Sequence, residues 1–283
     1  MSSNSSTITP KNQNQKIVIA TVASGSYVYG AETLFGSIKR CERNVNMRLM
    51  RLMTKSDNPS VLLESIGVEQ HIITNSSETL SLHFSERFRG TALKFAAINF
   101  LSKINADYLV LIDSDIFFNT TNSILSEITY DPQIENFAGC EDLACRIYYP
   151  GLTDYYQGTI GKVFNTGFLV FRQTFFEEGN WLEFTRACRE GLLKSYDSGD
   201  QGYMNHFAAM NDIKIRWLDL KFNYPLDIHY PKINPEIHYG IHFTGIKPWF
   251  FSPNTNDYFH WAYRAWWQSR ALSYPTRSKR INN

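Results

Sequence analysis

Val110-Leu111-Ile112-Asp113-Ser114-Asp115-Ile116-Phe117 is the stretch of this chain that does most to decide its fold. The apolar run from Tyr108 to Ile112 predicts a buried strand, and two carboxylates follow it directly. Buried parallel strands present functional groups at their carboxyl ends. Asp113 and Asp115 repel each other unless a cation lies nearby, and carboxylate oxygens suit Mg²⁺ or Mn²⁺. We therefore predict a metal ion that holds nucleotide phosphate here; the alternative is a solvated loop after a core strand.

The composition limits the class of protein. Of the 283 residues, 43% are hydrophobic, enough for a substantial core, and 15% are aromatic, which fits surfaces that stack bases or sugars. The net charge of +1 gives no basic field for a nucleic-acid partner. No run approaches the roughly 18 apolar residues of a membrane span, and the polar N-terminus is no signal peptide. We expect a cytoplasmic protein that does not span a membrane.

Cysteine usage agrees with that compartment. The chain has four cysteines without any C-x-x-C spacing, namely Cys41, Cys140, Cys145 and Cys188. They are interpreted as reduced, structural thiols.

Strand and helix patterns alternate along the first half of the chain. Residues 1–15 are polar and are predicted to be a disordered tail. The predicted strands are Lys16–Val22, Arg48–Thr54, His71–Thr74, Tyr108–Ile112 and Phe168–Phe171, and the predicted helices are Ala31–Arg40, Ser60–Ile66, a helix after Gly90 with Thr91 as its cap, and Trp181–Lys194. This alternation predicts an α/β fold with a Rossmann-like, mostly parallel sheet flanked by helices. We place this single domain at residues 16–256 and a C-terminal aromatic and basic helix and tail at 257–283.

Lys94 falls in the first turn of the helix after Gly90. A cation there opposes the helix dipole, so the position is favourable only if an anion also lies there. Helix N-termini bind phosphate, which makes Lys94 a candidate phosphate ligand. A lysine that extends from a surface turn is the simpler alternative.

Two further polar clusters precede apolar segments. Asp197-Ser198-Gly199-Asp200-Gln201-Gly202 places two carboxylates and an amide around flexible glycines, ahead of apolar residues at helical spacing. Asp200 is interpreted as a helix N-cap, a site residue, or both. Asn165-Thr166-Gly167 enters the apolar strand at Phe168, a pattern also typical of an ordinary loop-to-strand junction.

The last dense cluster is Ile241-His242-Phe243-Thr244-Gly245-Ile246-Lys247-Pro248-Trp249. A neutral His242 imidazole can ligate a metal ion. Gly245 allows close approach of the backbone, and Lys247 can meet phosphate as a point charge. A histidine beside apolar residues is more often a satisfied core residue, so the metal-ligand hypothesis requires His242 to meet the two aspartates in space.

Taken in order, these clusters resemble one family. They are YVYGAETLFGSIKR, TALK, LVLIDSD, FNTGFLVF, SGDQGYMN and HFTGIKPW. The set is similar to the glycogenin-like retaining glycosyltransferases of family 8, which have a GT-A fold. The resemblance runs from about Lys16 to Trp249, most of the chain.

The resemblance implies an enzyme that moves a hexose, glucose or galactose, from a UDP-sugar to a carbohydrate or glycolipid acceptor. It implies that Asp113, Asp115 and His242 hold Mn²⁺, or Mg²⁺, on the nucleotide diphosphate. The implied donor-binding residues are Thr21 and Tyr27 at the uracil, Lys94, Asp113, Ser114, Gly245 and Lys247 around the diphosphate, and Asn165 and Asp197 at the sugar. Asp200 and Gln201 are the implied catalytic residues, because they would stabilise positive charge at the anomeric carbon. The metal ion and two lysines would offset the negative charge on the leaving UDP.

Three alternatives to that function stay open. Self-glucosylation, as in glycogenin, could use Tyr230, although the segment Asn223–His242 is short and rich in proline. A phosphatase of the haloacid dehalogenase type would carry its Asp-x-Asp near the N-terminus and usually follow it with Gly-Thr, whereas Ile116-Phe117 follow here. A non-catalytic nucleotide-sugar binder is disfavoured by the full set of site residues.

The C-terminal segment Tyr258–Arg280 combines tryptophans with basic residues. Such a combination can hold a helix on an anionic membrane, so we expect peripheral membrane contact through this tail. The alternative is a helix that packs its tryptophans on the core. A homodimer is also left open.

Overall fold

The computed structural model describes residues 15–42, 45–73, 93–129, 134, 136–143, 162–177, 199–226, 239–245, 247–250 and 260–273. The strands are β1 (Ile17–Val22), β2 (Met47–Met53), β3 (Glu69–Ile72), β4 (Tyr108–Ile112), β5 (Ile116–Phe118), β6 (Phe137–Glu141), β7 (Phe164–Arg172), β8 (Ile215–Leu218), β9 (Tyr224–Pro225) and β10 (Gly240–His242). The α-helices are α1 (Val28–Cys41), α2 (Val61–Ser65), α3 (Leu93–Leu101), α4 (Ile124–Thr129), α7 (Gln173–Glu177), α9 (Asp200–Met210) and α10 (His260–Ser273). Short 3-10 helices are η1 (Gly25–Tyr27), η3 (Leu220–Phe222) and η4 (Pro248–Phe250).

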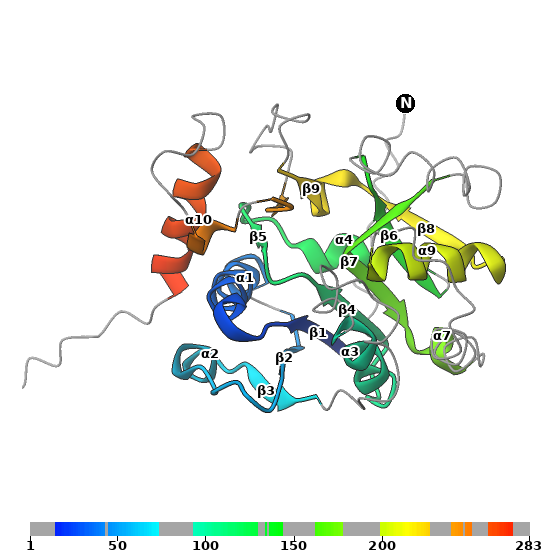
Figure 1. Ribbon diagram of the computed structural model, residues 1–283, viewed down its shortest axis with the longest axis horizontal. Coiled ribbons are helices and arrows are strands. Elements are labelled where there is room, and N and C mark those ends of the chain that lie inside the picture. Colours follow the sequence, from blue (N-terminus) through cyan, green and yellow to red (C-terminus); the bar gives the residue numbers. More distant parts are fainter. Residues whose placement is uncertain are drawn as a thin grey trace, which may run out of the picture.

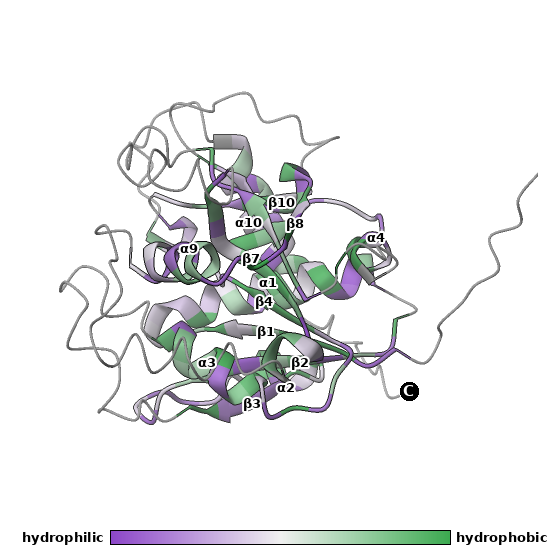
Figure 2. Ribbon diagram, turned by 90° about the vertical axis from the view of Figure 1, so that its right-hand side faces the viewer, coloured by the Kyte–Doolittle hydropathy of each residue, from purple (hydrophilic) through white to green (hydrophobic). Residues whose placement is uncertain are grey.

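The larger sheet has the strand order β3-β2-β1-β4-β7-β6-β8. Neighbours from β3 to β4 run parallel, β7 is antiparallel to both of its neighbours, and β8 is parallel to β6. Helices α3 and α9 pack on one face, and α1, α2 and α4 on the other (Figures 1 and 2). The predicted mostly parallel α/β sheet with helices on both faces is therefore confirmed.

Strand β4 is buried on both faces of this sheet. All five of its residues are buried. Leu109 and Leu111 face the helices α3 and α9, while Val110 and Ile112 face the opposite core, as expected from the alternation of side chains along a strand. A sheet covered on both faces requires this continuous apolar run, and each buried side chain contributes about 1.5–3 kcal/mol.

Strand β7 is longer than predicted and runs in the opposite direction to β4. It begins at Phe164 rather than Phe168, so the polar triplet Asn165-Thr166-Gly167 lies within the strand and not at a junction. Ile112 pairs with Phe168, and the Asp113 backbone N–H donates to the Gly167 carbonyl at 2.8 Å. The reversal places the triplet beside the carboxyl end of β4.

Two local predictions need correction. Gly199, with φ of 61°, is the N-cap of α9, so Asp200 is the first helical residue and the N-cap interpretation is wrong. The third strand covers Glu69–Ile72 rather than His71–Thr74, because Glu69 is already paired with Met50 of β2. The other predicted strands and helices that lie in the described residues are present with shifts of a few residues at their ends.

Several predictions concern residues outside those that the structure describes. They are the tail 1–15 apart from its last residue, Thr91, the helix Trp181–Lys194, Asp197, Tyr230, and the cysteines at 145 and 188. Cys41 and Cys140 are buried free thiols.

A second sheet, in the order β5-β10-β9, connects the site to the C-terminal helix. Trp266 of α10 packs against this sheet and is fully buried, and its ring lies 5.9 Å from that of Trp249. The packing alternative is therefore confirmed for Trp266, whereas Trp267 is 45% exposed. Within the described ranges, no helix has the length and apolar character needed to cross a membrane. Peripheral membrane contact stays a prediction.

Helix α1 closely approaches the turn between β4 and β5 at Gly30. A methyl group added at Gly30 would lie 2.2 Å from the Ser114 carbonyl oxygen and 2.7 Å from the Trp249 ring. We expect Gly30→Ala to lower the free energy of unfolding by about 1–3 kcal/mol, even though alanine favours a helix by about 1 kcal/mol. Urea denaturation measures this change.

Gly139→Ala is the matched control, because its added methyl would have its nearest neighbour at an ordinary 3.5 Å. We expect this substitution to change stability by less than about 1 kcal/mol. Equal stability of the two variants would contradict the tight contact between α1 and the turn.

Candidate active site

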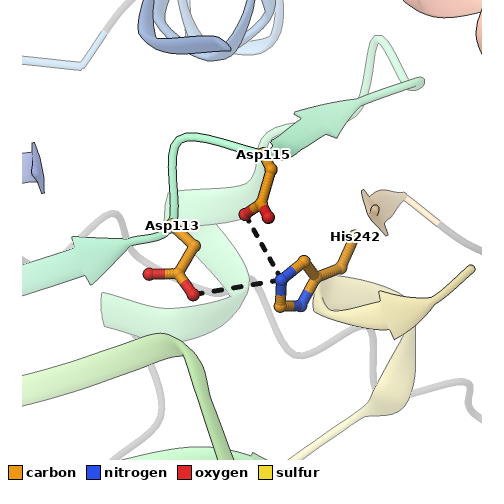
Figure 3. Close-up of side chains that lie close together, drawn as sticks. All are labelled: Asp113, Asp115 and His242. Atoms are coloured by element: carbon orange, nitrogen blue, oxygen red, sulfur yellow. Dashed lines mark ion pairs between the residues drawn. The ribbon is translucent and has the colours of Figure 1, made fainter. Parts of the chain in front are cut away.

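Asp113, Asp115 and His242 come together although more than a hundred residues separate the histidine from the aspartates. The His242 Nε2 atom lies 3.3 Å from Asp115 Oδ1 and 3.9 Å from Asp113 Oδ2 (Figure 3). One ligand atom from each of the three residues lies within 4.8 Å of the other two. The predicted convergence of these side chains is confirmed, while metal binding itself stays a prediction.

The pairing of strands explains this convergence. Asp113 directly follows strand β4, and Asp115 directly precedes β5. Strand β10 is antiparallel to β5 with His242 opposite Ile116, and the Phe243 N–H donates to the Asp115 carbonyl at 3.0 Å. The last residue of a late strand is thereby fixed beside the turn that carries both aspartates.

The surroundings shift the pKa values of the two aspartates in opposite directions. Burial raises the pKa of Asp113, and the attraction of Lys94 only partly offsets it. Burial also acts on Asp115, but Lys247 and His242 overcome it and hold the pKa of Asp115 well below its usual range. Asp115 is therefore held as a carboxylate, chiefly by the cationic Lys247 beside it.

Lys94 joins a buried carboxylate, Asp200, to a partly buried one, Asp113. Its side chain is 11% exposed, and Nζ lies 2.8 Å from Asp113 Oδ1 and 2.9 Å from Asp200 Oδ2. Nζ also donates to the Thr166 carbonyl and hydroxyl at 3.1 and 3.2 Å. Burial alone would lower the pKa of Lys94, but Asp113 and Asp200 raise it well above its usual range. The surface-lysine alternative is wrong, because the ammonium connects α3, β4 and α9.

Lys247 forms an ion pair with Asp115, as Lys94 does with Asp113. Its Nζ lies 2.5 Å from Asp115 Oδ2 and donates to the Phe243 carbonyl at 2.6 Å. Burial lowers the pKa of Lys247, and Asp115 more than restores it. Nearby Gly245 has open space where a Cβ would stand, so a ligand can approach its backbone.

Asn165, Asp200 and Gln201 lie together with Asp142 on one side of the Asp113, Asp115 and His242 cluster. The Gln201 amide donates to Asp142 Oδ2 at 2.6 Å, and the Asn165 amide donates to the same oxygen at 3.4 Å. Fully buried Asn205 fixes α9 against β7, since its amide bonds both the N–H and the carbonyl of Phe164. The polar start of α9 is thus held in register with the start of β7.

Thr21 and Tyr27 lie on the opposite side, near the carboxyl end of β1. Tyr27 is 39% exposed and its ring meets Trp249 edge-on at 5.1 Å. Ser114 is buried in the aspartate turn. The Thr21 hydroxyl is buried, and among the described residues it has no hydrogen-bond partner. Tyr27 offers a partly exposed ring at this edge, whereas Thr21 is fully buried, and contact of either residue with a nucleobase stays a prediction.

The donor set fits a divalent cation. Two carboxylates and one imidazole offer two hard oxygens and a nitrogen, which suits Mn²⁺ and, less well, Mg²⁺. Metal–ligand bonds of roughly 2–2.5 Å place two ligands of one ion at most about 4–5 Å apart, so the observed spacing needs little rearrangement. Buried carboxylates held by lysines can exchange one cation for another without being left unpaired.

Sequence reasoning missed Asp142, Asn205 and Asn223. Asp142 directly follows β6, whose carboxyl end lies at the same edge as that of β4, so the rule that identified Asp113 could have identified it. Asn223 precedes β9 and contacts His242 Nδ1 at 2.9 Å. Single amides such as Asn205 and Asn223 carry no signal of their role in one sequence.

Several solved structures with a similar architecture are glycosyltransferases. A structure of an active-site mutant of LgtC is 16% identical with a TM-score of 0.66, covering 93% of this chain and 98% of LgtC. The bifunctional glycosyltransferase WbbM is 18% identical with a TM-score of 0.65; the match covers 93% of this chain but only about half, 51%, of WbbM. Mouse xyloside xylosyltransferase 1 is 12% identical with a TM-score of 0.56, covering 81% of this chain and 98% of that protein.

A distant relative was found at the level of sequence. It is a protein of Arabidopsis thaliana named as a UDP-glucuronate:xylan alpha-glucuronosyltransferase, 23% identical over 255 residues. The match covers 88% of this chain but 39% of the relative, so this chain spans about two fifths of its length. No protein-family model matches the chain.

Fold and site together define a GT-A architecture with an Asp-x-Asp site. The resemblance to family 8 glycosyltransferases that the motifs indicated is confirmed by these structural neighbours and by the distant relative. At these identities the solved structures establish the fold and not the activity.

The buried position of Lys94 gives a stability prediction. In the metal-free protein, Lys94→Met would leave the buried Asp200 and the partly buried Asp113 without their shared cation. We expect the free energy of unfolding to fall by about 3–5 kcal/mol, the usual effect of breaking a buried ion pair. The exposed Lys103 provides the control, and Lys103→Met should change stability by no more than about 0.5 kcal/mol. Equal effects of the two substitutions, compared by urea denaturation, would show that Lys94 does not neutralise the two carboxylates.

Asp57 gives a pH prediction for the loop that carries Tyr27. Asp57 accepts hydrogen bonds from Gly25 N–H at 2.7 Å, Thr54 N–H at 2.8 Å and the Thr54 hydroxyl at 2.7 Å. Burial raises the pKa of Asp57, but these bonds prevail and lower it to about 2. A group whose pKa is lower in the folded than in the unfolded state stabilises the folded protein at pH values above its unfolded-state pKa, about 3.9 for an aspartate. This stabilisation is lost as the pH falls toward the folded-state pKa of about 2.

We therefore expect Asp57→Asn to destabilise the protein by about 1–3 kcal/mol at pH 5 and by progressively less at lower pH. Denaturation of both proteins between about pH 5 and 3 measures the difference. A difference that stays constant across this range would mean that the carboxylate charge of Asp57 does not fix the loop.

Proposed function

We propose that this chain is a retaining glycosyltransferase that moves a hexose from a UDP-sugar to a carbohydrate or glycolipid acceptor, with Mn²⁺ or Mg²⁺ as its cofactor. The observation that carries the proposal is the meeting of Asp113, Asp115 and His242 at the carboxyl edge of β4. Two largely buried lysines pair with these carboxylates, Lys94 with Asp113 and Lys247 with Asp115. Carboxylates that can hold a metal ion and lysines that can contact phosphate, grouped at one sheet edge, suit a bound diphosphate.

The bound metal ion would supply Lewis-acid stabilisation of the negative charge that grows on the leaving UDP. Asp113, Asp115 and His242 would hold it. Lys247 would transfer its hydrogen bonds from Asp115 to the diphosphate and Lys94 would add a second cation, each charge-assisted contact contributing roughly 1.5–3 kcal/mol. Tyr27 would stack on the uracil beside Thr21, and Ser114 and Gly245 would line the diphosphate.

The sugar would lie toward Asn165, Asp197, Asp200 and Gln201. Its anomeric carbon becomes positively charged as the bond to UDP breaks, and a carboxylate or amide oxygen can stabilise that charge. The Gln201 nitrogen is engaged by Asp142, so the amide oxygen is the atom that Gln201 would offer. Asp200 is ion-paired to Lys94. The negative charge that Asp200 presents to the sugar would therefore depend on whether Lys94 donates its hydrogen bonds to Asp200 or to another group.

The names of the similar proteins support a sugar acceptor and widen the choice of donor. One LgtC structure is a complex with donor and acceptor sugar analogues. The names of the others specify a xyloside and xylan as acceptors, with UDP-glucuronate as one donor. We therefore favour a separate carbohydrate or glycolipid acceptor over self-glucosylation, and donors beyond UDP-glucose and UDP-galactose need testing.

The proposal is tested by UDP release with Mn²⁺ from a panel of UDP-glucose, UDP-galactose, UDP-xylose and UDP-glucuronate. We expect release from one hexose donor, and Asp115→Asn should reduce it at least about 100-fold by removing a metal ligand. Asp212→Asn, at an exposed residue whose positive φ asparagine tolerates, is the control and should retain activity.

The same reactions separate the alternatives. A phosphatase would release inorganic phosphate, and a non-catalytic binder would release nothing from any donor. Intact-mass spectrometry of the protein after incubation distinguishes self-glucosylation, which adds a ladder of hexoses, from transfer to an added acceptor. Metal-independent release, or full activity of Asp115→Asn, would overturn the proposal.

A further inference from the structure

A chain of buried hydrogen bonds runs from a backbone amide of β7 to the far nitrogen of His242. The Gly167 N–H donates to Asn165 Oδ1 at 2.8 Å, and the Asn223 side-chain nitrogen donates to the same oxygen at 2.9 Å. Asn223 Oδ1 then lies 2.9 Å from His242 Nδ1. The other His242 nitrogen, Nε2, faces both aspartates (Figure 3).

The direction of every bond in this chain follows from its first donor. A backbone N–H can only donate, so the Asn165 atom that meets Gly167 must be the oxygen. The Asn165 nitrogen then faces Asp142, a carboxylate that accepts. Because Asn165 presents an oxygen to Asn223, Asn223 must present its nitrogen there and its oxygen to His242. An oxygen opposite Nδ1 requires a proton on Nδ1.

We propose that Asn223 is a positioning residue that holds His242 in the tautomer with its proton on Nδ1, so that Nε2 offers its lone pair between Asp113 and Asp115. This inference rests on the proposed function for the identity of the ion, a divalent cation, that would take the lone pair. The tautomer itself is a property of the metal-free chain. Metal-ligating histidines commonly donate their second N–H in this way, and such partners set ring orientation and ligand basicity.

Without Asn223 the opposite tautomer would be favoured. A proton on Nε2 would find Asp115 Oδ1 at 3.3 Å, a good acceptor that is itself held as a carboxylate. That arrangement would block the metal-facing nitrogen. Asn223 is 2% exposed and His242 is 6% exposed, so water does not readily replace the missing acceptor. Asn223 therefore opposes a competing hydrogen bond inside the site.

The same chain extends to the sugar side. Asp142 Oδ2, which accepts from Asn165, also accepts from the Gln201 amide at 2.6 Å. A methyl group at Gly167 would lie 2.6 Å from His242 Cε1, so the imidazole is also packed tightly against β7. Orientation of the metal ligand and orientation of Gln201 consequently depend on the same two side chains, Asn165 and Asp142.

The first test is nitrogen NMR of the metal-free full chain with labelled histidine, at about pH 8.5. We expect His242 in the wild type to carry a proton on Nδ1 and none on Nε2. In Asn223→Ala we expect the proton to move to Nε2. Asn223→Asp, which keeps an oxygen opposite Nδ1, should restore the Nδ1 proton. A wild-type spectrum without a proton on Nδ1, or spectra of wild type and Asn223→Ala that coincide, would overturn the proposal.

The second test measures Mn²⁺ affinity in the presence of UDP from the electron paramagnetic resonance of free Mn²⁺. We expect Asn223→Ala to weaken binding by about 10–100-fold, Asn223→Asp to recover most of it, and the exposed Asn211→Ala control to match the wild type. Thermal unfolding confirms that each variant is folded. Equal losses in Asn223→Ala and Asn223→Asp would reveal a merely structural role and overturn the proposal. Absence of Mn²⁺ binding by the wild type would instead overturn the proposed function, with the tautomer still readable by NMR.

Discussion

Repulsion among buried carboxylates is the constraint around which the site is built. Asp113, Asp115 and Asp200 converge at one edge of the sheet, where low solvent exposure makes an unpaired negative charge costly. Lys94 and Lys247 neutralise the carboxylates in the metal-free chain, and His242 completes the set. Lys94 comes from α3, Asp200 from α9, His242 from β10 and Lys247 from the segment after it, so the fold must bring these four parts of the chain to one place.

The arrangement of strands meets that requirement. Parallel strands β1 and β4 deliver Thr21 and Asp113 to the same edge, and the reversed strand β7 adds its polar beginning there. The small sheet places His242 opposite the aspartate turn, and α10 supports that sheet with Trp266 and Tyr263. Close approach of α1 at Gly30 fixes the turn from the other side. The aromatic C-terminal helix therefore has a structural role whether or not it also meets a membrane.

The sequence predicted those parts in which local pattern and tertiary structure agree. The apolar run before Asp113 had to be a doubly covered strand, and the alternation of strands and helices led to the mostly parallel sheet. The reversal of β7 was not predicted, because an apolar strand has the same pattern in either direction. Asp200 was misplaced by one position at the helix start, since the flexible Gly199 served as the cap.

Within the site, residue types with distinctive chemistry were predictable and amides were not. Two aspartates after a strand and a histidine near glycine and lysine carry a signal of metal and phosphate. Asn223 and Asn205 are buried asparagines whose importance depends on partners 19 and 41 residues away. The pairing of Lys94 with both Asp113 and Asp200 likewise depends on three-dimensional packing that spacing along the chain does not encode.

The central claim is that Asp113, Asp115 and His242 bind one divalent cation beside a nucleotide diphosphate. Crystals grown with Mn²⁺ and UDP, measured at the manganese absorption edge, test it most directly. We predict a single anomalous peak within bonding distance of one oxygen of each aspartate and of His242 Nε2, with Lys247 moved from Asp115 to the diphosphate. A manganese peak elsewhere, or UDP bound with Lys247 still paired to Asp115 and no peak between the three side chains, would contradict the account.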